Sequence, residues 1–466
     1  EGVAALEVPS LGKVARFAVP ALGVYLASPT MSLVDTAFVG LGDSGGLELA
    51  ALSPGTALCD TLVLFFNFLW VATTGLVASA SGDAREKTAR VRTAMHGAMY
   101  AASLLGVALA IFLATQSPAA MAFMGVDPAV IAPAAHYIAI RGAAMPFQLV
   151  GMACNAGMLG AGDSKASLLI TLAAAAVNLV GDWLLCPKTG IVGAAWATAA
   201  SLVVYCALQI LAAWRKGMLP RSAACLSGGE GRQGGQAGSP LSLLRPPSRG
   251  TVAAFMGYCG PYSFAMSTRV IGILAVASAA ARLGATPLGA HQVLGSLFFF
   301  LACWGEPLGQ TAQSMIPPLV RRGAGAGLSP KSSAAVRSLI GLLARVCIGV
   351  SVLLGLAGSA LLGGFPGFFT SSAEVAGELL RLSPMMAVVL VFSCINVLID
   401  GILLSLRDMR ALIAITSCTF SVQMACLLLG LPDMLGLVGV WCAQLGRLLA
   451  FFVLGIPRIL HLLPHA

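Results

Sequence analysis

Apolar residues are arranged along this chain in long, nearly unbroken blocks. The blocks run for roughly 20 to 30 residues and are bounded by Gly, Pro or charged positions, which matches what a helix needs to cross about 30 Å of hydrocarbon. Strands of a membrane barrel would instead alternate apolar and polar residues in segments of about 10. The pattern therefore predicts an all-α polytopic membrane protein with about twelve transmembrane helices.

The blocks also predict a division of the chain into two lobes. Residues 217–250 are rich in Gly, Ser and Pro and cannot bury enough apolar surface to order themselves. We expect a six-helix N-lobe over 13–216, a flexible linker over 217–250 and a six-helix C-lobe over 251–462. The predicted spans are 13–40, 47–80, 92–116, 128–160, 166–187, 190–215, 251–282, 287–320, 336–363, 374–405, 409–430 and 434–461.

The two halves repeat each other in short segments. Gly190 to Gly193, with the sequence Gly-Ile-Val-Gly, recurs as Gly-Leu-Val-Gly from Gly436 to Gly439. The segment Leu159 to Asp163 likewise recurs as Leu404 to Asp408. Parallel repeats of this kind, related by a pseudo-two-fold axis, place a substrate site at their interface and work by rocking one half against the other. The repeat favours a secondary transporter.

Composition and charge agree with a membrane location. Hydrophobic residues make up 58% of the chain, charged residues 10%, and the mean hydropathy is +0.91, whereas soluble domains carry about 25% charge. The net charge of +9 comes mostly from Lys and Arg on the side of the N-terminus, with only Lys188, Arg282 and Arg381 opposite. The positive-inside rule thus places both termini and the linker on the biosynthetic side, and no nucleic-acid partner is predicted.

Two acidic residues lie in the middle of apolar stretches. Asp35 and Asp182 are both surrounded by hydrophobic sequence, and Asn178 precedes Asp182 by one helical turn. A carboxylate at such depth is costly unless it is paired, wetted or protonated, so intramembrane acids usually mark proton or ion pathways. The alternative is a hydrogen-bonded staple between helices. Handling of protons or ions is the first hypothesis.

Motifs of cofactor-dependent and hydrolytic enzymes are missing from the sequence. The 12 Cys contain no C-x-x-C spacing, and neither H-E-x-x-H nor a Walker loop occurs. The string Gly42 to Gly46 spells a nucleophile-elbow pattern, but no strand precedes it. We therefore expect no cofactor, no bound metal and no enzymatic activity.

Three separated motifs resemble the multidrug and toxic compound extrusion (MATE) family, in its DinF branch. They are Leu33 to Gly40 in the first helix, Asn178 to Asp182 in the fifth and Gly193 to Thr198 in the sixth. The resemblance runs over essentially the whole chain and implies the MATE/MOP fold, a monomeric protein embedded in the lipid bilayer.

Further motifs resemble plant plastid-envelope members of the enhanced disease susceptibility type. Those proteins are associated with export of isochorismate, a salicylate precursor. This resemblance implies a chloroplast-envelope location, with the plasma membrane as the alternative, and a chain beginning at Glu1 is typical of a processed N-terminus. The motifs are Ser53 to Asp60, Tyr137 to Gly142, Ala290 to Val293 and Trp304 to Ser314.

The family resemblance implies roles for particular residues. Asp35 and Asp182 would be the ion-responsive carboxylates, with Asn178 and Thr198 as hydrogen-bond partners, and Pro20 would be the point at which the first helix bends. Secondary candidates are polar residues inside predicted spans: Tyr137, Asn155, Glu306 and Asp400.

Basic and amide side chains inside spans bear on the substrate. A guanidinium offers a planar fork suited to a carboxylate, although it can also snorkel or pair internally with an acid. The substrate candidates are Arg141, Arg269, Gln310 and Gln313.

The resemblance implies an antiporter that exports a small organic solute, such as an aromatic carboxylate, in exchange for H⁺ or Na⁺. Two alternatives stay open at this point. One is a lipid-linked oligosaccharide flippase of the same superfamily, and the other is a membrane-embedded enzyme.

Overall fold

The computed structural model describes residues 8–42, 47–80, 83–123, 126, 128–219, 246–320, 329–370 and 372–463. Within these ranges the regular structure consists of helices, and no strand occurs. Eleven helices in the described ranges are long and apolar enough to cross a membrane, or up to 12 if one bent pair counts as a single span. The prediction of an all-α polytopic protein with about twelve spans is confirmed.

The first six predicted spans correspond to eight helices, because two spans are broken. One span breaks at Phe66, and another bends by 49° at Ala144. The helix predicted over 92–116 is longer than expected, since its backbone hydrogen bonds continue through the charged residues at its start. The helices are α1 (Leu11–Gly42), α2 (Leu47–Phe65), α3 (Asn67–Ala78), α4 (Ala84–Phe123), α5 (Pro128–Ala143), α6 (Met145–Gly160), α7 (Ser164–Thr189) and α8 (Ile191–Arg215).

The remaining spans include one further broken helix and a short helix before the last span. The break falls at residues 303–305, between α10 and α11. The elements are α9 (Arg249–Arg282), α10 (Ala285–Ala302), α11 (Glu306–Met315), η3 (Pro317–Leu319), α12 (Pro330–Gly364), η4 (Pro366–Phe368), α13 (Ala373–Ser405), α14 (Met409–Leu428), α15 (Leu431–Leu435) and α16 (Leu437–Leu462).

Contacts divide the chain into two compact units. One unit comprises Leu26–Cys259, and the other comprises Glu1–Tyr25 together with Gly260–Ala466. Helices α1 and α9 therefore each contribute to both units. The expected linker falls largely on residues 220–245, which lie outside the described ranges, so the lobe boundaries 13–216, 217–250 and 251–462 stay a prediction.

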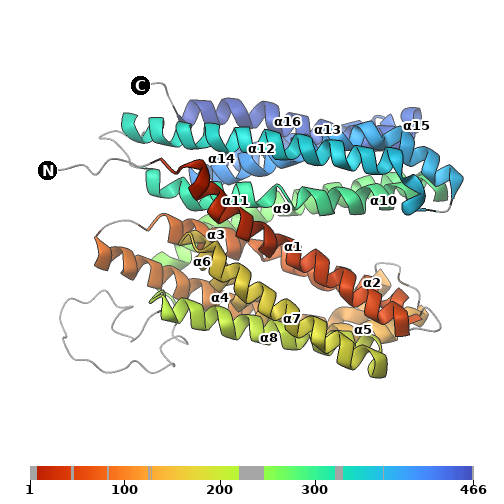
Figure 1. The fold of residues 1–466 in the computed structure, drawn as a ribbon, viewed down its shortest axis with the longest axis horizontal. Coiled ribbons are helices and arrows are strands. Elements are labelled where there is room, and N and C mark those ends of the chain that lie inside the picture. Colours follow the sequence, from red (N-terminus) through yellow and green to blue (C-terminus); the bar gives the residue numbers. More distant parts are fainter. Residues whose placement is uncertain are drawn as a thin grey trace. The chain divides into compact units, whose positions relative to one another are not determined.

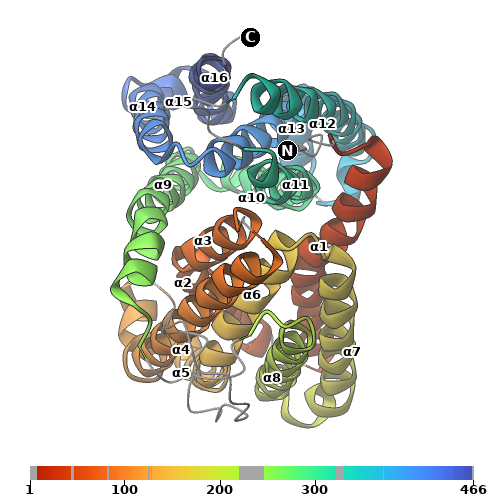
Figure 2. The ribbon, with the colours of Figure 1, turned by 90° about the vertical axis from the view of Figure 1, so that its left-hand side faces the viewer.

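Within each unit, neighbouring helices pack in pairs. Figure 1 and Figure 2 both show α7 beside α8 in the unit Leu26–Cys259, and α12 beside α13 in the other unit. The close approach of α7 and α8 depends on Gly181, since a Cβ there would lie 2.7 Å from the Ala197 Cβ. A small residue at such a contact lets two helix backbones approach each other.

The repeated segments fold alike in the two units. In the first, Gly162 adopts φ +85° and Asp163 then caps α7 by accepting from the N–H three residues further on, at 3.1 Å. In the second, Arg407 adopts φ 58° and Asp408 caps α14 in the same way, at 3.3 Å. Each left-handed residue reverses the chain so that an aspartate can satisfy the free N–H groups of the next helix.

Asp163 lies between α6 and α7, outside the spanning helices, and forms an ion pair with Lys216. Burial raises the pKa of Asp163, but the hydrogen bonds from Lys216 and from the Ala166 N–H outweigh it and leave the pKa below its usual value. A lowered folded-state pKa stabilises the protein above about pH 4 and loses that contribution as the pH falls further. We expect the thermal midpoint of Asp163→Asn to fall less than that of the wild type between pH 5 and pH 3. Equal acid sensitivity would contradict this assignment.

The buried face of α7 is polar and its exposed face is apolar. Asn178 and Asp182 lie on the buried face, while Trp183 on the other face is 65% exposed. This is the reverse of a helix in a soluble domain and is typical of a helix whose outer face contacts lipid. The buried stripe is Ser164, Ser167, Thr171, Ala174, Asn178, Asp182 and Cys186.

Helices α11 and α13 make backbone contact at two glycines. A Cβ on Gly401 would lie 2.5 Å from the Gly309 carbonyl oxygen, which is too close for any side chain. We expect Gly401→Ala to lower the free energy of unfolding by about 1–3 kcal/mol, because the backbones must separate. Thermal unfolding in detergent measures this. Gly349→Ala in α12 is the matched control, since a Cβ there meets nothing within 4 Å, and equal midpoints of the two variants would contradict the prediction.

Candidate functional site

The structure brings the two intramembrane acids together in the unit Leu26–Cys259. Asp35 of α1 is 6% exposed, and Asp182 of α7 is fully buried. Asp182 and Asn178 of α7 both lie close enough to the Asp35 carboxyl to interact with it electrostatically. Thr198 of α8 donates from Oγ1 to Asp35 Oδ2 at 3.4 Å. Three helices thus place four polar side chains from distant parts of the sequence at one point.

Each acid keeps one oxygen without a donor. Cys186 donates from Sγ to Asp182 Oδ1 at 3.7 Å, which leaves Asp182 Oδ2 without a partner among the described residues. Asp35 Oδ1 likewise has no donor among the described residues, and both oxygens are buried. An unsatisfied buried carboxylate oxygen is costly, and two adjacent carboxylates repel each other when both are charged. A proton shared by the pair, or a bound cation, would relieve both costs.

No ion pair in the described ranges involves either acid of the pair. The guanidinium of Arg141 on α5 is engaged elsewhere: Nη2 donates to Asp60 Oδ1 at 2.5 Å, and Nη1 donates to the Tyr137 hydroxyl at 3.2 Å. Arg141 remains within electrostatic range of Asp35. The acid pair is therefore next to a positive charge but is not neutralised by direct contact with it.

Tyr137 and Asn155 occupy different surroundings. Tyr137 is fully buried, and its ring packs against Gly55 of α2, where a Cβ would lie 2.9 Å from the ring. Asn155 on α6 is 1% exposed, and neither atom of its amide has a hydrogen-bond partner within 8–42, 47–80 and the other described ranges. Tyr137 thus accepts a hydrogen bond from Arg141, whereas Asn155 takes no part in the Arg141–Asp60 ion pair.

A second charged cluster lies in the unit that contains α10 to α16. Arg269 of α9 forms an ion pair with Asp400 of α13, and its guanidinium stacks 5.9 Å from the centroid of the Phe451 ring on α16. Glu306, at the start of α11, lies within electrostatic range of both partners. A pair inside a spanning region lowers the cost of burying both charges.

The two predicted glutamines lie on α11, beyond Glu306. Gln310 is 1% exposed, and its Oε1 accepts from the Tyr25 hydroxyl at 3.1 Å. Gln313 is half-buried, and its Oε1 has no donor in the part of the chain that the structure describes. Since residues four apart share a helix face, Glu306 and Gln310 point to the same side of α11.

The structure adds one neighbour that the sequence did not suggest and gives the surroundings of two residues already known to lie in or near spans. Cys186 contacts Asp182, and its position one turn later on the same face was the signal that could have revealed it. Asp60 is the ion-pair partner of Arg141, which the spacing of 81 residues conceals. Arg447 on α16 lies near Arg269 and Asp400; its place inside a predicted span could be recognised from the sequence, but its neighbours could not.

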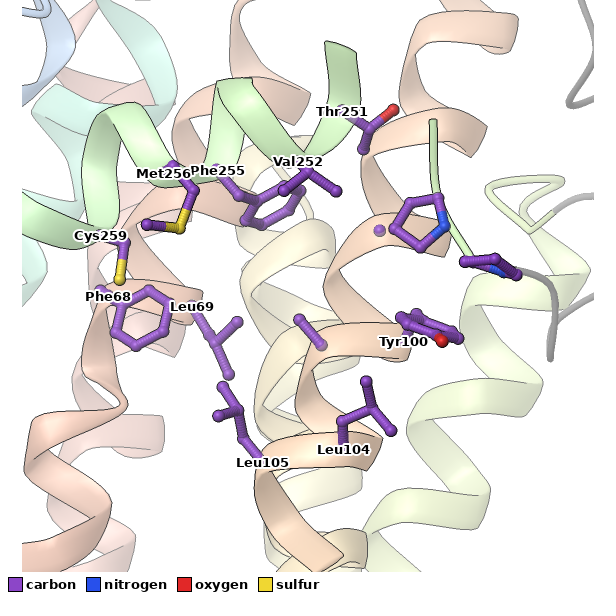
Figure 3. Close-up of a pocket in the computed structure, with 14 residues that line it drawn as sticks. Phe68, Leu69, Tyr100, Leu104, Leu105, Thr251, Val252, Phe255, Met256 and Cys259 are labelled. Carbon is purple, nitrogen blue, oxygen red and sulfur yellow. The ribbon is translucent and has the colours of Figure 1, made fainter. Parts of the chain in front are cut away.

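An apolar cavity of about 430 Å³ lies between α3, α4 and α9, within Leu26–Cys259. Figure 3 shows Phe68 and Leu69 facing Phe255 and Met256 across it, with Tyr100 at one end. Its lining contains no charged side chain, and neither acid of the pair contributes to it. The volume falls in the range of small-molecule sites, about 300–1,000 Å³.

A metal site of the usual kind is not formed by the described residues. Over those ranges, no group of three or more His, Cys, Asp and Glu side chains could hold a metal ion. The acid pair offers two carboxyls, with Asn178 and Thr198 as the other oxygen-bearing neighbours.

Comparison with known proteins places the chain among transporters. Residues 20–184 match the MatE family. The chain is 32% identical over 414 residues to Protein DETOXIFICATION 47, chloroplastic, of Arabidopsis thaliana, which covers 88% of this chain and 70% of that protein. It is 24% identical over 330 residues to Protein DETOXIFICATION 44, chloroplastic, of the same plant, covering 68% and 59%. It is also 28% identical over 170 residues to DNA damage-inducible protein F of Escherichia coli, covering 36% of each.

Solved structures share the fold at low sequence identity. A crystal structure of a MATE in the bent conformation superposes with a TM-score of 0.77 at 16% identity, covering 97% of this chain and 95% of that one. A MOP superfamily transporter from Pyrococcus furiosus gives 0.75 at 18% identity, covering 97% and 96%. The predicted MATE/MOP fold is confirmed, and so is the expectation that the protein is not an enzyme. The chain belongs to the multidrug and toxic compound extrusion (MATE) family of integral membrane transporters.

Proposed function

We propose that this transporter is an antiporter that exports a small organic solute in exchange for protons bound by the Asp35–Asp182 pair. The observation that carries the proposal is the pair itself: two buried, adjacent carboxyls, each with one oxygen that no described residue satisfies. One proton between them would supply the missing donor and remove the repulsion between two negative charges.

Coupling follows from the cost of burying charge. When both acids are charged, water must reach them. The transporter then has to be open toward the side of low proton activity. Protonation removes that requirement and lets α1 repack against its neighbours. Substrate and proton then favour opposite states of one element, and the strength of coupling is bounded by their differential binding energies. The two-lobe division of the chain would provide the rocking motion.

Helix α1 is suited to be the moving element in this scheme. It carries Asp35, and it contributes to both compact units, with the boundary after Tyr25. Pro20 lies five residues before that boundary and lacks the N–H that would bond to the preceding turn. We propose Pro20 as the bending point. The helix is continuous from Leu11 to Gly42 in this structure.

The substrate we propose is an aromatic carboxylate such as a salicylate precursor, and the site of action is the chloroplast envelope. The relatives DETOXIFICATION 47 and 44 are both named chloroplastic, which supports the location over the plasma membrane.

The test is transport by the purified full chain, taken as a monomer, in proteoliposomes with a pH gradient and a sodium gradient imposed separately. Labelled salicylate and an organic cation are followed in parallel. Transport driven by the pH gradient alone supports proton exchange. Transport that responds only to sodium, or to neither gradient, contradicts it, and uptake of the cation alone contradicts the proposed substrate.

A further inference from the structure

Arg447 lies in the middle of the spanning helix α16, in the unit that contains Gly260–Ala466. Ten residues precede it within the helix and fifteen follow, so it is far from either end. The side chain is half-buried, and no nitrogen of its guanidinium is among the buried atoms without a partner. The guanidinium is therefore not fully enclosed by protein, although it lies at depth in the span. A cation in such a place normally has an anionic partner.

The acids near Arg447 do not serve as that partner. Asp400 is paired with Arg269, and Glu306 lies more than 4 Å from any basic nitrogen of the residues described in this unit. The described ion pairs include Arg141, Arg269 and Arg458 but not Arg447. Arg269 and Asp400 nevertheless lie within electrostatic range of it. The neutral Arg269–Asp400 pair thus lies near a guanidinium that has no ion-pair partner among the described residues.

The surroundings of Arg447 are fixed by hydrogen bonds that hold α16 to its neighbours. Asn396 of α13 donates from Nδ2 to the Leu448 carbonyl at 3.1 Å. Gln423 of α14 donates from Nε2 to Gln444 Oε1 at 2.9 Å. Gln444, three residues before Arg447, shares its helix face. The guanidinium is therefore presented from a rigid position between two anchored residues, as a preorganised binding group requires.

A carboxylate would complete this arrangement. It carries the charge that Arg447 lacks opposite it, and its two oxygens match the planar guanidinium fork. The Phe451 ring, one turn further along the same face, could contact an apolar part of the ligand. One side of that ring is already covered by the Arg269 guanidinium. A neutral or cationic ligand would leave the guanidinium without a counter-ion.

We propose that Arg447 is the residue that binds the carboxylate of an organic anion, and that Arg269, which the sequence singled out, instead neutralises Asp400. This inference deepens the proposed function, since it names the group that selects anionic substrates. It concerns equilibrium binding in one unit and does not depend on the Asp35–Asp182 pair.

The test is isothermal titration calorimetry of the purified full chain in nanodiscs, with benzoate as the anionic probe and benzamide as its neutral isostere. The wild type is expected to bind benzoate more tightly than benzamide. Arg447→Gln should weaken benzoate binding by about 10- to 100-fold, the loss typical of a charged hydrogen bond, and leave benzamide unchanged. Arg345→Gln, an exposed arginine in α12, is the control and should change neither affinity.

Benzoate affinity that survives in Arg447→Gln would overturn the inference, as would a wild type that does not distinguish the two probes. Arg447→Lys keeps the positive charge but lacks the planar guanidinium group. It is the variant to measure if Arg447→Gln does not fold. It should bind benzoate less tightly than the wild type, and undiminished affinity would overturn the assignment. A failure of proton coupling leaves these binding results unaffected, so the two proposals fail separately.

Discussion

Replacing Asp35 with Asn is expected to lower the initial rate of transport driven by a pH gradient by about 100-fold, near the upper end of typical coupling energies. Asparagine has nearly the same shape but can neither take up nor release a proton. The Thr198 hydroxyl can still bond to the new side chain, so the packing of α1 against α8 is kept. The measurement is the initial rate in proteoliposomes, with the amount of folded protein determined from its gel-filtration profile.

The control for this variant is Asp433→Asn, the same chemical change at an exposed acid of α15. It should transport at the wild-type rate. The double variant Asp35→Asn with Asp182→Asn should be hardly slower than either single variant, because the two carboxyls act as one proton site and their effects are not additive. Independent, multiplying losses would show that the acids do not form a unit, and an undiminished rate in Asp35→Asn would remove the pair from the mechanism.

Replacing Asp400 with Asn is expected to lower the free energy of unfolding by about 3 kcal/mol, because it leaves the Arg269 charge without its partner inside the spanning region. The Asp400 side chain is 13% exposed and that of Arg269 is 27% exposed, so water compensates little of the loss. Replacing both residues with Met should restore most of the stability, since a buried ion pair and a well-packed apolar pair are often nearly equivalent.

Thermal unfolding in detergent distinguishes these outcomes. A midpoint for Asp400→Asn equal to that of the wild type would show that Arg269 is stabilised by another group. A double variant no more stable than Asp400→Asn would show that Asp400 contributes something other than neutralisation. Asp433→Asn again serves as the control for an acid-to-amide change without an ion pair.

The spans could be predicted from the sequence because the bilayer directly determines the length and the hydropathy of a segment that crosses it. The helix breaks could not. The interruptions at Phe66, at Ala144 and at residues 303–305 fall inside apolar blocks, and the prolines that follow the last two, Pro146 and Pro307, do not by themselves distinguish a break from a tolerated kink. They depend on how each half-helix packs against its neighbours, which a hydropathy pattern does not contain.

The two acids could be predicted from the sequence because a buried charge in an apolar span is energetically costly and therefore rare. A carboxyl in a long apolar stretch stands out, and Asn178 marks the face that Asp182 occupies. The partners of the arginines were not predictable, because Arg141 meets Asp60 and Arg269 meets Asp400 across 81 and 131 residues of sequence. Arg447 could be recognised as unpaired only after those two pairs were seen.

Difference infrared spectroscopy of the reconstituted protein across a pH titration tests the central role of the pair most directly. A protonated carboxyl in apolar surroundings has its own C=O stretching band, separate from that of a carboxylate. We expect a band that appears as the pH falls, shifts when substrate is added, and is lost in both Asp35→Asn and Asp182→Asn. The same band, unchanged in both variants, would show that neither acid binds the transported proton.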